Sequence, residues 1–202
     1  FIGQMLVLYI LAIKISEVRK EISRSDYTNK INELKKLPDL IQNTLNCQDK
    51  MQIIAKDFLQ ARGAMFLGRG LSFPIALEGA LKLKELSYLH AEGYPAGEMK
   101  HGPLALIEEG LPVVILAPKD RYFEKTISNM QEVIARGGKV ILISNESNNI
   151  ISENVRFTLK IPATDDLLTP FLMTIPLQLL AYHVASLKNC DIDKPRNLAK
   201  SV

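Results

Sequence analysis

Glutamate and lysine side chains recur along one face of a predicted helix in the first half of the chain. Glu78, Lys82 and Glu85 lie at positions i, i+4 and i+7, so a helix places all three in one narrow stripe. A carboxylate next to an ammonium group can transfer protons, but the same spacing also stabilises an ordinary solvated helix face. The spacing by itself favours the solvated face, and the wall of a polar cavity is the alternative.

His101 is a second candidate for proton transfer. It lies in the segment HAEGYPAGEMKHGPLAL, where glycines, prolines and charges crowd together without helix or strand periodicity, which predicts a loop. Loops often carry catalytic groups, and the histidine side chain titrates near neutral pH. A lone histidine is more often structural, so both interpretations of His101 stay open.

Lys200 lies two residues from the end of the chain, in the terminal segment CDIDKPRNLAKSV. A lysine in this place is ordinarily a frayed, solvated charge. If the tail instead folds back over a site, burial or nearby positive charge can lower the lysine pKa and leave an amine that attacks a carbonyl. The two interpretations separate an enzyme from a protein that merely binds.

A glycine turn precedes the helix that carries the stripe. Gly68 and Gly70 frame the turn, Ser72 can cap the helix, and Pro74 falls in its first turn. A glycine turn at a helix N-terminus can hold a phosphate, but a lone GxG pattern is also typical of a plain tight turn.

Short apolar runs alternate with longer helical segments along the rest of the chain. Helices are predicted over 51–62, 73–90, 121–136 and 165–187, and strands over AMFLG, PVVILA, KVILIS and VRFTLK. This alternation predicts a parallel sheet covered on both faces, which is a three-layer α/β/α sandwich. Ligands in such sheets gather at the carboxyl ends of the strands, which directs attention to the turn after AMFLG.

Composition narrows the class of protein. The 202 residues carry a net charge of only +3, spread along the chain, so a nucleic-acid-binding surface is poorly supported. The two cysteines, Cys47 and Cys190, lack metal-binding or disulfide spacing and are typical of a cytoplasmic protein.

The first 45 residues differ from the rest. They read as a helix over 1–22 and a second over 29–45, broken at Pro38. The opening apolar run of 13 residues is shorter than a membrane span needs, so we expect a buried helix at a cut edge of a longer protein and no membrane partner.

Three segments together resemble the isomerase region of the glucosamine-6-phosphate synthases, the glutamine:fructose-6-phosphate amidotransferase family. They are ALEGALKLKELSYLHAEGYPAGEMKHGPLAL, PLQLLAYHVA and DKPRNLAKSV. The resemblance implies a sugar isomerase (SIS) domain with a flavodoxin-like parallel sheet of five strands. It also implies that residues 1–45 are the trailing helices and linker of a preceding SIS domain, and that residues 46–202 are a second SIS domain with a catalytic C-terminal tail.

The resemblance assigns roles to the candidate residues. Lys200 matches the lysine that forms a Schiff base with open-chain fructose 6-phosphate, and Glu85 matches the carboxylate that moves a proton between C1 and C2. Lys82 matches the lysine beside that carboxylate. His101 matches the histidine implicated in ring opening, which the neighbouring subunit supplies in the family. Lys82, Glu85 and Lys200 are thus also the expected sugar contacts, and the stripe becomes the wall of a cavity. In the family the phosphate is held mainly by the other SIS domain, which weakens the phosphate interpretation of the glycine turn.

The implied function is conversion of fructose 6-phosphate and ammonia to glucosamine 6-phosphate, the first step of amino-sugar (UDP-GlcNAc) biosynthesis. No cofactor and no metal are expected. The implied partners are a glutaminase domain and a first SIS domain of the same protein, and a second subunit in a homodimer. We expect a cytoplasmic enzyme whose present part is inactive by itself. The alternatives are another SIS sugar-phosphate isomerase or deglycase, and a non-catalytic SIS module that binds a sugar phosphate or nucleotide sugar.

Overall fold

Five parallel strands form one sheet in the computed structural model, which describes residues 1–146 and 154–198. The spatial order is β2-β1-β3-β4-β5, the order of flavodoxin-like doubly wound folds. The predicted α/β fold with a five-stranded parallel sheet is therefore confirmed. The strands are β1 (Gly63–Gly68), β2 (His90–Pro95), β3 (Pro112–Leu116), β4 (Lys139–Ser144) and β5 (Phe157–Lys160).

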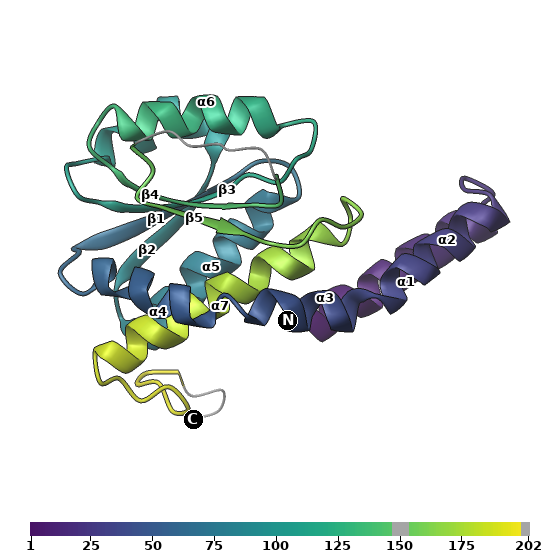
Figure 1. Ribbon diagram of the computed structural model, residues 1–202, viewed down its shortest axis with the longest axis horizontal. Helices are drawn as coiled ribbons and strands as arrows, with labels where there is room; N and C mark the ends of the chain where they lie inside the picture. The colour runs from purple at the N-terminus through teal and green to yellow at the C-terminus, as the bar shows by residue number, and fades with distance from the viewer. Residues whose placement is uncertain (147–153, 199–202) are drawn as a thin grey trace.

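Helices cover both faces of the sheet and complete the three layers (Figure 1). One face carries α4 (Gln48–Ala55), α5 (Ser72–Ser87) and α7 (Thr169–Leu187), and the other carries α6 (Phe123–Ile134). Each interface has its own apolar core, because side chains alternate across the strands. Short 3₁₀ turns complete the body: η1 (Lys56–Phe58), η2 (Ala96–His101) and η3 (Pro103–Leu106).

Helix α7 is long and apolar enough to span a membrane by length and composition alone. However, 72% of it is buried inside the domain, where it packs beside α4 and α5. Its apolar character is thus accounted for by its place in the core.

Strand β2 was not predicted from periodicity, since its residues read as part of a loop. It pairs with β1 over its whole length, from Gly63 opposite His90 to Gly68 opposite Pro95. It is an edge strand, where Gly93 and a terminal Pro95 are tolerated because one side of the strand makes no ladder hydrogen bonds. The predicted loop begins only after Pro95.

The first three helices form an arm that projects from the body (Figure 1). They are α1 (Ile2–Val18), α2 (Arg24–Lys35) and α3 (Leu37–Leu45). One side of α1 packs on the body, with Tyr9 edge-on to Phe171 at 6.3 Å between ring centroids.

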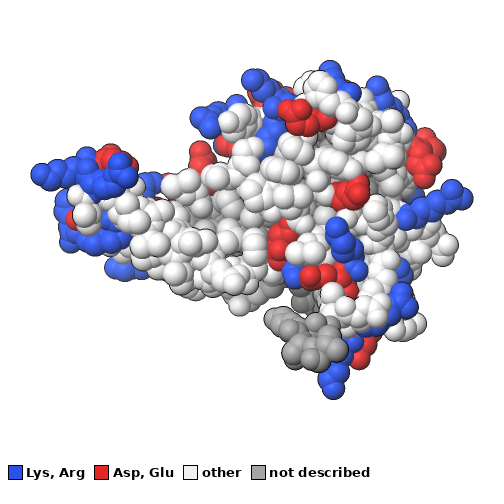
Figure 2. Space-filling view, turned by 180° about the vertical axis from the view of Figure 1, so that it is seen from behind, with Lys and Arg blue, Asp and Glu red and all other residues white. Residues whose placement is uncertain are grey.

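The other side of α1 is exposed, so the prediction of a buried helix is wrong for most of its length. Its apolar residues surround the helix, and only one side finds a partner within this chain. The arm face seen in Figure 2 is largely free of charged side chains between its tip and the body. The apolar residues of α1 that are at least 47% exposed are Val7, Leu8, Leu11, Ile15 and Val18.

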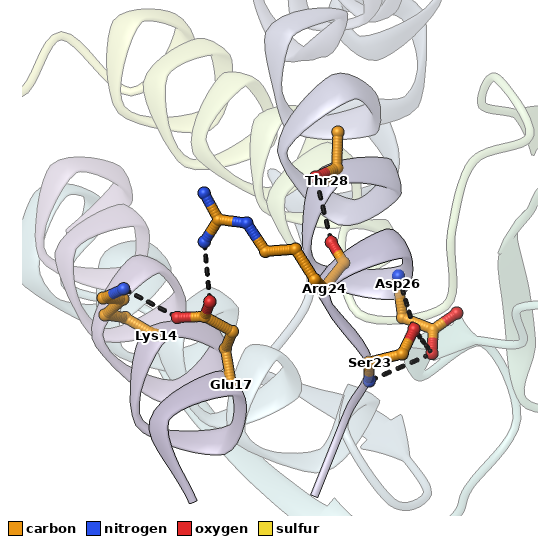
Figure 3. Close-up of polar contacts among 6 residues, drawn as sticks. All are labelled: Lys14, Glu17, Ser23, Arg24, Asp26 and Thr28. Carbon is orange, nitrogen blue, oxygen red and sulfur yellow. Dashed lines mark hydrogen bonds and ion pairs between the residues drawn. The ribbon is translucent and has the colours of Figure 1, made fainter. Parts of the chain in front are cut away.

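Ion pairs and a capping box close the turn between α1 and α2 (Figure 3). The hydroxyl of Ser23 accepts the amide of Asp26 at 3.0 Å, and the Asp26 carboxylate accepts the amide of Ser23 at 3.3 Å. Glu17 accepts hydrogen bonds from Lys14 and Arg24, each at 2.6 Å, which lowers the pKa of its carboxyl. The cap starts α2 at Arg24, five residues before the predicted start.

The predicted helix break lies at Lys36 and not at Pro38. Pro38 falls in the first turn of α3, where its missing N–H would have no helical partner in any case.

Candidate active site

The stripe of ionisable side chains on α5 is partly buried. Lys82 Nζ lies 2.6 Å from Glu85 Oε2 and 3.9 Å from Glu78 Oε1. The side chains of Glu78, Lys82 and Glu85 are only 11%, 31% and 26% exposed. The stripe is therefore less solvated than an ordinary exposed helix face. One ammonium group thus lies between two carboxylates, an arrangement that can exchange protons with a bound substrate.

The C-terminal tail turns back toward this stripe after α7 ends. Residues 190–198 follow α7 without regular structure, and Lys200 lies outside the described residues. The amide of Arg196 donates to Tyr88 Oη at 2.8 Å, and the Arg196 guanidinium lies 4.2 Å from the centre of the Tyr88 ring. Tyr88 is the residue that ends α5, three positions after Glu85. The described part of the tail therefore contacts the C-terminal end of α5 at Arg196.

The contact between Tyr88 and Arg196 was missed by the sequence reasoning. The two residues are 108 positions apart, and no spacing rule links a helix-ending tyrosine to an arginine in an irregular tail. The only signal was the composition of the tail, with Pro195 and Arg196 ahead of Lys200.

His101 and Glu85 lie at opposite ends of strand β2. His101 ends η2, which follows the carboxyl end of β2, whereas Glu85 lies near the end of α5, just before the amino end of β2. Because β2 has six residues, its two ends lie about 20 Å apart. The His101 side chain is 76% exposed, with Nε2 3.9 Å from Glu98 Oε2. The chain thus brings Lys82 and Glu85 together and leaves His101 apart from them.

The glycine turn after β1 is tightly closed. A Cβ on Gly68 would lie 2.4 Å from the carbonyl oxygen of Ser72. The amides of Ser72 and Phe73 already donate to the carbonyls of Arg69 and Gly70, and Pro74 has no N–H. Few amides remain for an anion, so the geometry favours the tight-turn interpretation over a phosphate cradle.

A pocket of about 390 Å³ lies beside this turn, at the carboxyl ends of β1 and β3. Ser72, Asp120, Arg121 and Tyr122 contribute to its lining. The candidate proton-transfer residues Lys82 and Glu85 on α5 and His101 in η2 do not line it. The candidate proton-transfer groups therefore lie outside the crevice in which doubly wound folds usually bind ligands.

Cys47 does not offer a nucleophile. Burial raises the pKa of its thiol to about 11, so the thiolate is scarce at neutral pH. Among the described residues no cluster of three histidine, cysteine or acidic side chains has a geometry that could hold a metal ion.

Comparison with known proteins identifies the family of the chain and several similar proteins. Residues 57–188 match the model of the SIS domain family. The chain is 48% identical over its full 202 residues to glutamine--fructose-6-phosphate aminotransferase [isomerizing] of Aquifex aeolicus (strain VF5). It is also 48% identical over 202 residues to the protein of that name from Bacteroides thetaiotaomicron. The chain spans 33% of the length of each of these relatives.

A solved structure has nearly the same fold. It is the C-terminal domain of glucosamine-fructose-6-phosphate aminotransferase from Francisella tularensis, with a TM-score of 0.93 and 42% sequence identity. The match covers 96% of this chain and 55% of that one.

Proposed function

Because the chain belongs to the SIS domain family, we propose that it is the isomerase part of a glucosamine-6-phosphate synthase. The match to the aminotransferases named above covers the full length of the chain, including the segments that hold Lys82, Glu85, His101 and Lys200. The observation that carries the proposal is the docking of Arg196 on Tyr88, three residues after Glu85. Lys200 follows Arg196 by four residues, which can span at most about 14 Å.

The proposed reaction converts fructose 6-phosphate and ammonia to glucosamine 6-phosphate and water. An acid–base group first opens the sugar ring, and the Lys200 amine then adds to the C2 ketone and expels water to form an iminium. Ammonia displaces the lysine. A carboxylate finally takes the proton from C1 and returns a proton to C2, which leaves an aldehyde at C1 and an amine at C2. Oxidation at C1 balances reduction at C2, so the stoichiometry requires no external oxidant or reductant.

The positions of Glu85 and Lys82 support their roles, whereas the role of His101 rests on the resemblance of its KHGP segment to the family. Glu85 is the proton carrier between C1 and C2, because it is a partly buried carboxylate with an ammonium group 2.6 Å away. Lys82 can stabilise the negative oxygen that develops at C1 while the proton is on Glu85. His101 is the acid–base group for ring opening.

His101 and Glu85 lie at opposite ends of strand β2, so one chain cannot bring them together. We therefore assign to one site the Glu85 of one copy of the chain and the His101 of a second copy. Leu77 and Leu81, on α5 beside the stripe, are 44% and 40% exposed. Exposed leucines next to a polar site suit a subunit interface, so the proposed enzyme is a homodimer.

The remainder of the proposed enzyme must supply what this chain lacks. Ammonia comes from glutamine through a glutaminase domain, and a first SIS domain completes the sugar site, with residues 1–45 as its trailing helices. Contact with that domain would cover the exposed apolar side of α1. Residues 1–202 alone should form no glucosamine 6-phosphate. The free thiols of Cys47 and Cys190 suit a cytoplasmic location.

The substitution Glu85→Gln in the full-length protein tests the proposal. Glutamine keeps the size of the side chain but cannot carry the proton, so kcat for the formation of glucosamine 6-phosphate should fall by about 10²–10⁴-fold. The KM for fructose 6-phosphate should change little, because binding does not require the transfer.

Glu124→Gln is the matched control, since Glu124 is an exposed carboxylate on α6. It should leave both constants unchanged. Near-normal turnover by the Glu85→Gln protein would overturn the role of Glu85.

A further inference from the structure

One charged side chain in the glycine turn after β1 has no role in the function proposed above. It belongs to Arg69, which lies between Gly68 and Gly70. Gly68 is paired with Pro95 in the parallel ladder of β1 and β2, so the segments that follow these two strands leave the sheet side by side. Arg69 therefore lies next to η2, the segment that ends at His101.

The guanidinium of Arg69 lies flat against η2 at Gly97. A Cβ on Gly97 would lie 3.0 Å from Arg69 Nη2 and 3.1 Å from both Cζ and Nη1. Because these three distances are nearly equal, the flat face of the guanidinium meets the backbone of η2. Glycine leaves room for this close approach, and a planar guanidinium can stack in a way that an ammonium group cannot.

Asn129 on α6 holds the guanidinium in this place. Its Oδ1 accepts hydrogen bonds from Arg69 Nε at 3.2 Å and from Arg69 Nη2 at 3.0 Å. Asn129 is only 6% exposed, so water competes little for these bonds to a charged donor. A second contact joins η2 to α6, since Lys100 Nζ lies 3.1 Å from Glu132 Oε1. Arg69 thus links the end of β1, η2 and α6.

The position of η2 depends on such contacts. A 3₁₀ helix has poorer hydrogen-bond geometry than an α-helix, and η2 follows Pro95, which has no polar side chain to cap it. Buried Ala96 and Met99 anchor η2 in the apolar core beside α6. The His101 side chain, by contrast, is 76% exposed, with Nε2 3.9 Å from Glu98 Oε2. The segment that carries His101 therefore sets its place more than the contacts of its own ring do.

We propose that Arg69 is a positioning residue for His101: held by Asn129, its guanidinium fixes η2 and thereby the point from which His101 reaches the site of a second subunit. The contacts of Arg69 are those described above, whereas the use of His101 in ring opening rests on the proposed function. A histidine that acts on a sugar held by another chain needs a fixed place in its own domain. Loosening η2 should slow the proton transfer and leave sugar binding nearly unchanged.

The test places Arg69→Lys on one chosen subunit of a full-length mixed dimer. One subunit carries Glu85→Gln and the other carries His101→Asn, so the single complete site combines the His101 of the first with the Glu85 of the second. The two chains carry different affinity tags, and purification through both tags isolates the mixed dimer. Lysine keeps the charge of Arg69 but loses the flat face and the paired donors.

The expected result depends on which subunit carries Arg69→Lys. On the subunit that supplies His101, it should lower kcat for glucosamine 6-phosphate formation roughly tenfold, with little change in the KM for fructose 6-phosphate. On the subunit that carries His101→Asn, it should leave turnover unchanged, because η2 of that subunit serves a site that is already inactive. A general loss of stability would act from either subunit, so the difference between the two placements isolates the positioning role.

Gly97→Ala disturbs the same contact from the side of η2. Its methyl group would lie 3.0 Å from the guanidinium, so Arg69 must shift away from η2. The kcat should therefore fall with the same dependence on placement. Arg62→Lys, at an exposed arginine just before β1, is the matched control and should change kcat in neither placement.

Two results would overturn the inference in separable ways. If the mixed dimer without Arg69→Lys is inactive, the shared site fails, and the proposed role of His101 and the positioning role of Arg69 fail with it. If that dimer is active but Arg69→Lys lowers kcat equally from both subunits, or from neither, the shared site stands and Arg69 does not position His101.

Discussion

His183 shows how burial of a single titratable residue couples stability to pH. It lies on α7 and is 7% exposed, and its Nε2 has no hydrogen-bond partner among the described residues. Burial lowers the pKa of its imidazole because the charged form loses hydration, and the negative charge of Asp49 opposes this only in part. The native protein thus keeps His183 neutral at a pH where the unfolded chain is protonated.

The sign of the pH effect follows from proton binding. Below the unfolded pKa of about 6.5 the unfolded state binds more protons than the native state, so the free energy of unfolding falls as pH drops toward the native pKa. The melting temperature of the protein should therefore decrease between pH 7 and pH 5. In His183→Phe this decrease should be smaller, whereas His90→Gln, at a side chain that is 75% exposed, should behave like the unchanged protein. An equal pH response in all three proteins would contradict the role of His183.

At the scale of elements, the turn from β1 to α5 sets where the stripe lies. Gly68 ends β1 four residues before Ser72 begins α5, and the Ser72 carbonyl occupies the space that a Cβ on Gly68 would need. The start of α5 cannot move away without breaking its contacts with the sheet and α7.

Gly68→Ala should therefore destabilise the protein by about 1–3 kcal/mol, because a backbone atom must shift to admit the methyl group. Gly3→Ala is the control, since a Cβ on Gly3 in α1 would meet nothing within 4 Å. Alanine should there be neutral or stabilising, because Gly3 lies in the first turn of α1 with free space around its Cα. Denaturant unfolding of both variants measures the difference, and equal stabilities would contradict this account of the turn.

Local patterns predicted most elements but not those that depend on distant contacts. The apolar runs of β1, β3 and β4, which are buried on both faces, and the half-buried run of β5 predicted four strands. The family resemblance implied a fifth strand but did not locate it. Strand β2 was read as a loop because Gly93 and Pro95 are permitted there by its edge position, which local sequence does not encode. Likewise the stripe on α5 was located by its spacing, but its burial depends on tertiary packing.

The contact of the tail with α5 could not be predicted from periodicity either, because it also depends on residues that are far apart in the sequence. The contact between Tyr88 and Arg196 joins positions that no local rule relates. His101 lies at the carboxyl end of the sheet because η2 follows β2 in the chain. This position could be predicted only if β2 were already known to be a strand.

At the scale of the whole molecule, the separation of His101 from Glu85 makes the proposed site depend on two chains. Full-length subunits with Glu85→Gln and subunits with His101→Asn should each be nearly inactive. When the two are dissociated, mixed and reassembled, half of the dimers pair unlike subunits, and each such dimer regains one of its two sites. Activity should thus recover to about a quarter of the unchanged enzyme. No recovery would contradict a site shared between subunits.

The most direct measurement of the central claim is borohydride trapping on the full-length protein with fructose 6-phosphate, followed by mass mapping of the C-terminal peptide. Reduction of a Schiff base would fix a sugar-sized mass on Lys200, and Lys200→Arg would show none because arginine keeps the charge without the nucleophilic amine. The account predicts that adduct at Lys200. Bound sugar with no adduct at Lys200 would contradict it, and the tail would then be a structural ending to a domain that only binds its ligand.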